Sequence, residues 1–166
     1  MKTIMLMRHS HASSDNPAFS DHDRPLTSSG RALASTTAQQ LFEIQTPDRI
    51  LCSSATRTKE TADILAAQLT VNTQPESLDS LYLAPAREYS NACADYLTDS
   101  TDTVLIVGHN PGIASLIATW ANDHLSVSPA TVAVFRVDVD HWQSLTRGDR
   151  FHAELSGLIT QGTRVR

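Results

Sequence analysis

Short apolar runs alternate along the chain with longer segments in which apolar residues recur every three or four positions. Residues 2–7, 49–52 and 103–107 are apolar runs of strand length, and the last, TVLIV, is β-branched and apolar on both faces. That pattern is typical of a central strand in a parallel sheet, buried on both sides. Residues 131–139 alternate between apolar and polar positions, and residues 151–155 are predicted to pair with them as an antiparallel edge.

Helices are predicted between these strands. Thr27 is a candidate N-cap for the first, since its hydroxyl can accept a hydrogen bond from a free backbone N–H. A second helix is predicted around residues 62–69, where apolar residues recur at helical spacing. Pro85 opens a third, because its missing N–H costs little in a first turn, and a fourth follows Gly112. This alternation predicts a three-layer α/β/α domain with a mostly parallel central sheet.

Composition limits the class of protein. The 166 residues include 13 Lys and Arg and 18 Asp and Glu, a formal net charge of −5, with 40% hydrophobic and 5% aromatic residues. We therefore expect residues 1–166 to form a single domain. A net acidic chain with few aromatic residues lacks the basic surface and stacking rings typical of nucleic-acid binding. No apolar run has the length of a membrane span, and two cysteines, Cys52 and Cys93, predict no disulfide framework, so we expect a cytoplasmic protein.

Three predicted strands end in residues with unusual chemistry. Arg8 and His9 follow the first strand, Arg57 comes shortly after the second, and His109 follows the central one. Sites in open α/β sheets form outside the carboxyl ends of strands, so we expect these side chains to meet in one crevice. Guanidinium groups pair with phosphate oxygens in a bidentate manner, and a neutral imidazole can attack phosphorus. The pattern therefore predicts a cationic phosphoryl site that needs no metal.

Four motifs follow one another along the chain: Met7-Arg8-His9-Ser10, Asp23-Arg24-Pro25-Leu26-Thr27 with Gly30, the segment from Ser53 to Ala62, and Val107-Gly108-His109-Asn110-Pro111-Gly112. In this order they resemble the motifs of the histidine phosphatase superfamily, whose fold is phosphoglycerate mutase-like, and they fit best its short branch of SixA-type phosphohistidine phosphatases. The resemblance covers residue 2 to about residue 120, and more loosely the remainder. It implies His9 as the nucleophile. The phosphoryl ligands that it implies are Arg8, Arg57 and His109, with Arg24 as a substrate contact at the rim.

The chain departs from the larger relatives at the general acid. Those relatives supply a carboxylate from the region after the third strand, where this chain has residues 77–82. Asp79 and Glu88 are the nearest candidates, and neither lies in a recognisable motif. An alkoxide leaving group needs a proton from a positioned acid, typically worth roughly 10²–10⁴-fold in rate, whereas the imidazole of a phosphohistidine can leave already protonated. The sequence therefore favours phosphoramidates such as phosphohistidine, or other activated substrates, over sugar phosphates. A second departure, Ser10 where many members have glycine, is common in the short branch.

A metal site is the main alternative within the N-terminal loop. His11 lies two residues after His9, and Asp21, His22 and Asp23 could supply further ligands. Arg8 beside them would repel a cation, so we predict no metal and no other cofactor. The acidic loop residues, Asp15 included, are better explained as a solvated loop, with a substrate-facing role as the alternative. The residues predicted to pack in the core are Tyr82, Tyr89, Tyr96 and Trp120.

The leading hypothesis is a metal-independent phosphatase that forms a phosphohistidine at His9. Its expected partner is a phosphorylated protein, such as a histidine-containing phosphotransfer domain, or a small phosphorylated substrate, with neither nucleic acid nor membrane. The alternatives are a small-molecule phosphomonoesterase of the same superfamily and a phosphate-binding module without turnover. A mutase is disfavoured, because mutases of this family carry longer insertions and a clear acid.

Overall fold

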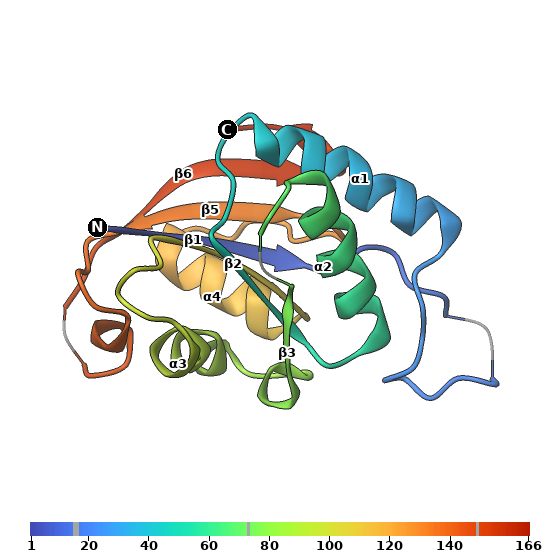
Figure 1. Cartoon of the computed structure of the whole chain (residues 1–166), viewed down its shortest axis with the longest axis horizontal. Coiled ribbons are helices and arrows are strands. Elements are labelled where there is room, and N and C mark those ends of the chain that lie inside the picture. The colour runs from blue at the N-terminus through green and yellow to red at the C-terminus, as the bar shows by residue number, and fades with distance from the viewer. Residues whose placement is uncertain (15–16, 73, 149) are drawn as a thin grey trace.

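The computed structural model describes residues 1–14, 17–72, 74–148 and 150–166, so Asp15 lies outside the described residues. Within these ranges one seven-stranded sheet has the order β3-β2-β4-β1-β5-β6-β7 (Figure 1). The strands are β1 Lys2–Arg8, β2 Arg49–Ser53, β3 Glu76–Leu78, β4 Thr103–Gly108, β5 Val132–Val137, β6 Ala153–Thr160 and β7 Thr163–Arg164. All except β5 and β7 run in the same direction, which confirms the mostly parallel sheet.

Helices cover both faces of the sheet (Figure 1). They are α1 Ser28–Phe42, α2 Thr56–Gln68, α3 Ala86–Tyr96 and α4 Gly112–Ala121, with short 3₁₀ turns η1 Asp79–Leu81 and η2 Trp142–Leu145. Buried residues of α1 and α2 pack with one face of the sheet, and those of α3 and α4 pack with the other. The predicted three-layer architecture is therefore confirmed. No helix in the described part of the chain is long and apolar enough to cross a membrane.

The strongest sequence signals correspond to the best-buried elements. Every residue of β4 is buried between β1 and β2, as the TVLIV run predicts. Thr27 is the N-cap of α1, with its side chain accepting from the Gly30 N–H at 3.0 Å. Pro85 directly precedes α3. The two cysteines are buried and free.

The carboxyl-terminal edge of the sheet differs from the prediction. β6 pairs with β5 in antiparallel fashion as expected, but it continues to Thr160 and is not the edge. A two-residue turn at Gln161 and Gly162, both at positive φ, brings the short β7 back against it. Positive φ at both central positions is the geometry that favours tight hairpins, and glycine adopts it without strain. The core assignment of Tyr96 is also wrong: this last residue of α3 is 43% exposed.

Candidate active site

The ends of β1 and β4 bring the two site histidines together. These strands are parallel neighbours whose register places Arg8 opposite Gly108. The next backbone N–H, that of His9, donates to the Gly108 carbonyl at 3.0 Å, and the ring centroids of His9 and His109 lie 5.3 Å apart. A side chain at Gly108 would clash with Tyr89, whose hydroxyl accepts the His109 backbone N–H at 3.1 Å. Buried Tyr89 is thus both a core residue, as predicted, and a support for the site.

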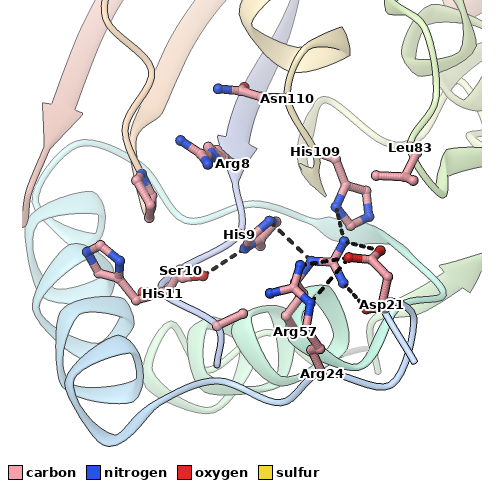
Figure 2. A pocket seen from close by; sticks show the side chains of 12 residues that line it. Arg8, His9, Ser10, His11, Asp21, Arg24, Arg57, Leu83, His109 and Asn110 are labelled. Carbon is pink, nitrogen blue, oxygen red and sulfur yellow. Dashed lines mark hydrogen bonds and ion pairs between the residues drawn. The ribbon is translucent and has the colours of Figure 1, made fainter. Parts of the chain in front are cut away.

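Arg57 links the two histidines from the first turn of α2. Its side chain is only 2% exposed, whereas an arginine on a helix more often faces solvent. Its Nε donates to His9 Nε2 at 3.3 Å, and Nη2 donates to His109 Nδ1 at 3.3 Å (Figure 2). Nη1 donates to the Asp21 backbone carbonyl at 2.6 Å, and Nη2 also reaches the Asp21 carboxylate at 3.2 Å. The guanidinium is therefore fixed in place by four contacts.

The hydrogen bonds of His9 assign its tautomer. Nδ1 lies 2.7 Å from the Ser10 carbonyl oxygen, an acceptor only, so the ring proton is on Nδ1. Nε2 then carries the lone pair and accepts from Arg57. Burial lowers the pKa of His9 to about 4; the bond to the Ser10 carbonyl opposes this shift and the charge of Arg57 adds to it. At neutral pH the imidazole is therefore uncharged, with Nε2 available as a nucleophile.

His109 is also neutral, but the ring nitrogen that does not contact Arg57 has a different partner from that of His9. Its Nε2 lies 2.7 Å from the buried hydroxyl of Ser53, and Nδ1 accepts from Arg57. Burial, followed by the charge of Arg57, lowers the pKa of His109 to about 3. In this structure the Nδ1 lone pair faces Arg57, so the proton is on Nε2 and is donated to Ser53. Because a hydroxyl can also donate, Ser53 is compatible with a proton on Nδ1 once Arg57 turns away.

The remaining cations border the same pocket, which has a volume of about 380 Å³. Arg8 Nη1 donates to the Val127 carbonyl at 3.0 Å, and its buried Nε has no hydrogen-bond partner among the described residues. Arg24 donates through Nη1 to the Ser13 carbonyl at 2.8 Å and also lines the pocket. The structure thus brings together all five residues singled out from the sequence. The lining consists of Arg8, His9, Ser10, His11, Ala12, Asp21, Arg24, Arg57, Leu83, His109, Asn110 and Pro129.

Two residues of the site were not assigned to it from the sequence. Asp21, treated as a solvated loop residue, is half-exposed and its carboxylate contacts both Arg57 and Arg24. Tyr82, treated as a core residue, donates its hydroxyl to Asp21 Oδ2 at 2.6 Å and packs edge-on against the His109 ring, with centroids 5.6 Å apart. The bond from Tyr82, followed by those from the two arginines, holds the pKa of Asp21 well below its usual range. The one sequence signal for Asp21 is its position three residues before Arg24; Tyr82 has none.

Neither proposed general acid borders the pocket. Asp79 is exposed in η1, and Glu88 bonds to Arg87 and Asn91 on α3. The Ser10 hydroxyl is also directed away, since it is fully buried and donates to the Gly30 carbonyl at 2.7 Å.

His11 borders the rim without forming part of a ligand cluster. Over the described residues, no three His, Cys, Asp or Glu side chains gather in a group that could hold a metal ion. His22, a second candidate ligand, is bonded to Ser54 and Asp23.

Comparisons with known proteins relate part of this chain to one superfamily. Residues 4–81 match the model of the histidine phosphatase superfamily (branch 1). An uncharacterized chloroplastic protein from Arabidopsis thaliana is 28% identical over 151 residues, covering 86% of this chain and 69% of its own.

Solved structures of SixA proteins share the fold. A candidate phosphohistidine phosphatase SixA from Nakamurella multipartitia is 28% identical, with a TM-score of 0.73 over 96% of this chain and 95% of its own. The protein histidine phosphatase SixA in complex with tungstate gives a TM-score of 0.79 at 20% identity, over 96% and 97% of the two chains.

An uncharged imidazole beside the buried Arg57 and the partly buried Arg8, where two parallel strands end, is the arrangement expected from the four motifs. Residues 4–81 thus match the histidine phosphatase superfamily, and this match supports a phosphatase activity. The chain has the fold of the SixA-type structures.

Proposed function

We propose that the protein is a metal-independent phosphohistidine phosphatase that works through a covalent phosphohistidine at His9. The observation that carries the proposal is the state of His9, a neutral ring with its Nε2 lone pair within hydrogen-bond distance of the Arg57 guanidinium. An inert phosphate-binding module has no need of an uncharged nucleophile beside a buried arginine.

The reaction has two displacements. The Nε2 lone pair of His9 forms a bond to phosphorus as the phosphorus–nitrogen bond of the substrate breaks, and that bond's electron pair returns to the leaving imidazole. Water then attacks the phosphohistidine, which releases inorganic phosphate and restores the neutral His9 ring. Arg8 and Arg57 stabilise the phosphoryl oxygens by charge and hydrogen bonds, the contribution that a metal makes in other phosphatases. His109 joins them as a donor when its proton is on Nδ1 and the Ser53 hydroxyl donates to Nε2.

Among the described residues that line the pocket, no carboxyl group holds a proton for a leaving group, which supports this class of substrate. Asp21 borders the pocket, but its donors keep it ionised, so it has no proton to give an alkoxide. A protonated imidazole leaves without such help. We therefore propose protein phosphohistidine, on a histidine-containing phosphotransfer domain for example, as the substrate. A single domain over residues 1–166 and a cytoplasmic location stay predictions.

The test is a comparison of substrates with the purified protein in excess EDTA. We expect rapid dephosphorylation of a phosphorylated histidine-containing phosphotransfer domain and slow hydrolysis of sugar phosphates, with both lost in His9→Ala. Faster hydrolysis of a monoester than of the phosphoprotein would identify a phosphomonoesterase instead. Stable binding of the phosphoprotein without turnover would identify a binding module.

A further inference from the structure

The Asp21 carboxylate occupies donors that a phosphoryl group would use. Its Oδ1 accepts from Arg24 Nε and Nη2 at 3.2 and 2.8 Å, and its Oδ2 accepts from Arg57 Nη2 at 3.2 Å (Figure 2). Among the described residues that line the pocket, Asp21 is the one with an acidic side chain. An anion is therefore already present where the proposed function requires the substrate's anion to bind.

The burial of Arg57 explains why the Asp21 carboxylate lies beside its guanidinium. A charged group at 2% exposure is costly unless it is paired, and Asp21 is its ion-pair partner in the described structure. A phosphoryl group would supply the same compensation with more negative charge. Asp21 and the phosphoryl group are therefore alternative partners of one guanidinium.

Two contacts keep Asp21 beside the pocket when its carboxylate is displaced. The Tyr82 hydroxyl bonds to Oδ2 at 2.6 Å, and the Asp21 backbone carbonyl accepts from Arg57 Nη1 at 2.6 Å. The carboxylate does not need to leave the site, since a small shift frees Arg57 Nη2 and Arg24. Half of the side chain is exposed, so solvent can accommodate that shift.

We propose that Asp21 is a built-in competing anion. It pairs with the phosphoryl ligand Arg57 and with the substrate contact Arg24 when no substrate is bound, releases them when substrate binds, and pairs with them again when product phosphate leaves. It thereby weakens the binding of inorganic phosphate and limits product inhibition. The inference rests on the proposed phosphoryl pocket and adds a residue that sets its affinity.

Asp21→Asn is the direct test, because the amide is similar in size, removes the charge and retains the backbone carbonyl bond to Arg57. Asp23→Asn is the matched control: it makes the same change in net charge two residues away, on a side chain that bonds to Ser20 and His22 and does not border the pocket. Asp21→Ala is a second variant, which removes the side chain altogether. Thermal unfolding of each variant verifies the fold.

The measurement is titration calorimetry of inorganic phosphate and tungstate binding. We expect Asp21→Asn and Asp21→Ala to bind both anions about tenfold more tightly than the unmodified protein, since one like charge is removed from a partly exposed site. Asp23→Asn should stay within about twofold. The gain should be larger for phosphate above its second pKa than below it, because a dianion is repelled more strongly. A purely structural role for Asp21 would not produce that dependence.

Unchanged or weaker anion binding in both Asp21 variants would overturn the inference and show that Asp21 only positions Arg57 and Arg24. The calorimetry needs no turnover, so its outcome is separate from that of the substrate comparison. A protein that binds phosphate but hydrolyses nothing refutes the proposed function alone. An active enzyme in which the Asp21 variants bind phosphate no better refutes this inference alone.

Discussion

Replacing Arg57 with alanine removes the group that contacts both site histidines and Asp21 at once. Its guanidinium donates to His9 Nε2, His109 Nδ1 and two oxygens of Asp21 from a position that is 2% exposed. In the proposed transition state these N–H groups turn to the phosphoryl oxygens. Loss of one preplaced donor in a site that excludes water costs about 2.7–4 kcal/mol, roughly 10²–10³ in rate.

The same substitution also changes the protonation of His9, and the two effects can be separated by pH. The charge of Arg57 contributes to the lowered pKa of His9, so its removal raises that pKa from about 4. Even a full return to the ordinary value of about 6.5 would leave roughly 90% of the rings neutral at about pH 7.5. A hundredfold loss of rate at that pH is therefore caused by the loss of the hydrogen-bond donor and not by protonation of His9. Protonation adds a further loss only as the pH falls toward and below the raised pKa.

The assay is kcat/KM for an activated aryl phosphate and for phosphohistidine between about pH 5 and pH 8. Arg57→Lys is the matched variant, since it keeps the positive charge and loses the planar fork, and we expect it to recover only part of the lost rate. Circular dichroism and thermal unfolding verify that each variant is folded. If folded Arg57→Ala retains more than about a tenth of the normal kcat/KM at neutral pH, Arg57 is not the transition-state donor described here.

Four further outcomes follow from the same geometry. His9→Ala should reduce turnover by several orders of magnitude and abolish an acid-labile, base-stable phosphate that rapid quenching should trap on the unmodified protein; near-normal turnover would reject the covalent route. Activity should persist in excess EDTA, and loss of turnover that one specific ion restores would show a metal mechanism. In an NMR titration His9 should gain its proton near pH 4 and His109 near pH 3, and titration of either at its ordinary pKa would contradict their burial. Asp79→Asn and Glu88→Gln should change kcat/KM by less than about threefold on any phosphate, because neither borders the pocket; a large loss on alkyl phosphates alone would identify the acid.

The elements predicted correctly from the sequence are those with a strong local signal. The apolar run of β4 and the Thr27 cap of α1 determine their own structure. β3 is three residues long with one buried position, and β7 has two residues, both exposed, so neither gives a periodic pattern. Their pairing depends on neighbouring strands and on a tight turn, which are tertiary effects.

The same distinction applies to the site. The positions of His9 and His109 follow from a general property of parallel sheets, that strand ends meet at one edge, so two short motifs were enough to place them together. The bond between Asp21 and Tyr82 joins residues 61 positions apart in two irregular segments, for which no such rule exists. A polar loop residue and a tyrosine with apolar neighbours have the same local appearance whether or not they meet at a pocket.

Sequence motifs alone do not explain why His9, and not His109, should be the nucleophile. The two rings have similarly lowered pKa values, and both contact Arg57. The ring nitrogens that do not contact Arg57 have different hydrogen-bond partners. His9 Nδ1 faces the Ser10 carbonyl, which only accepts, so the lone pair on Nε2 is fixed; His109 Nε2 faces the Ser53 hydroxyl, which can accept or donate. A nucleophile needs a fixed lone pair, whereas a ligand of the phosphoryl group must be able to present an N–H. One backbone carbonyl and one hydroxyl therefore account for the different roles proposed for two otherwise similar histidines.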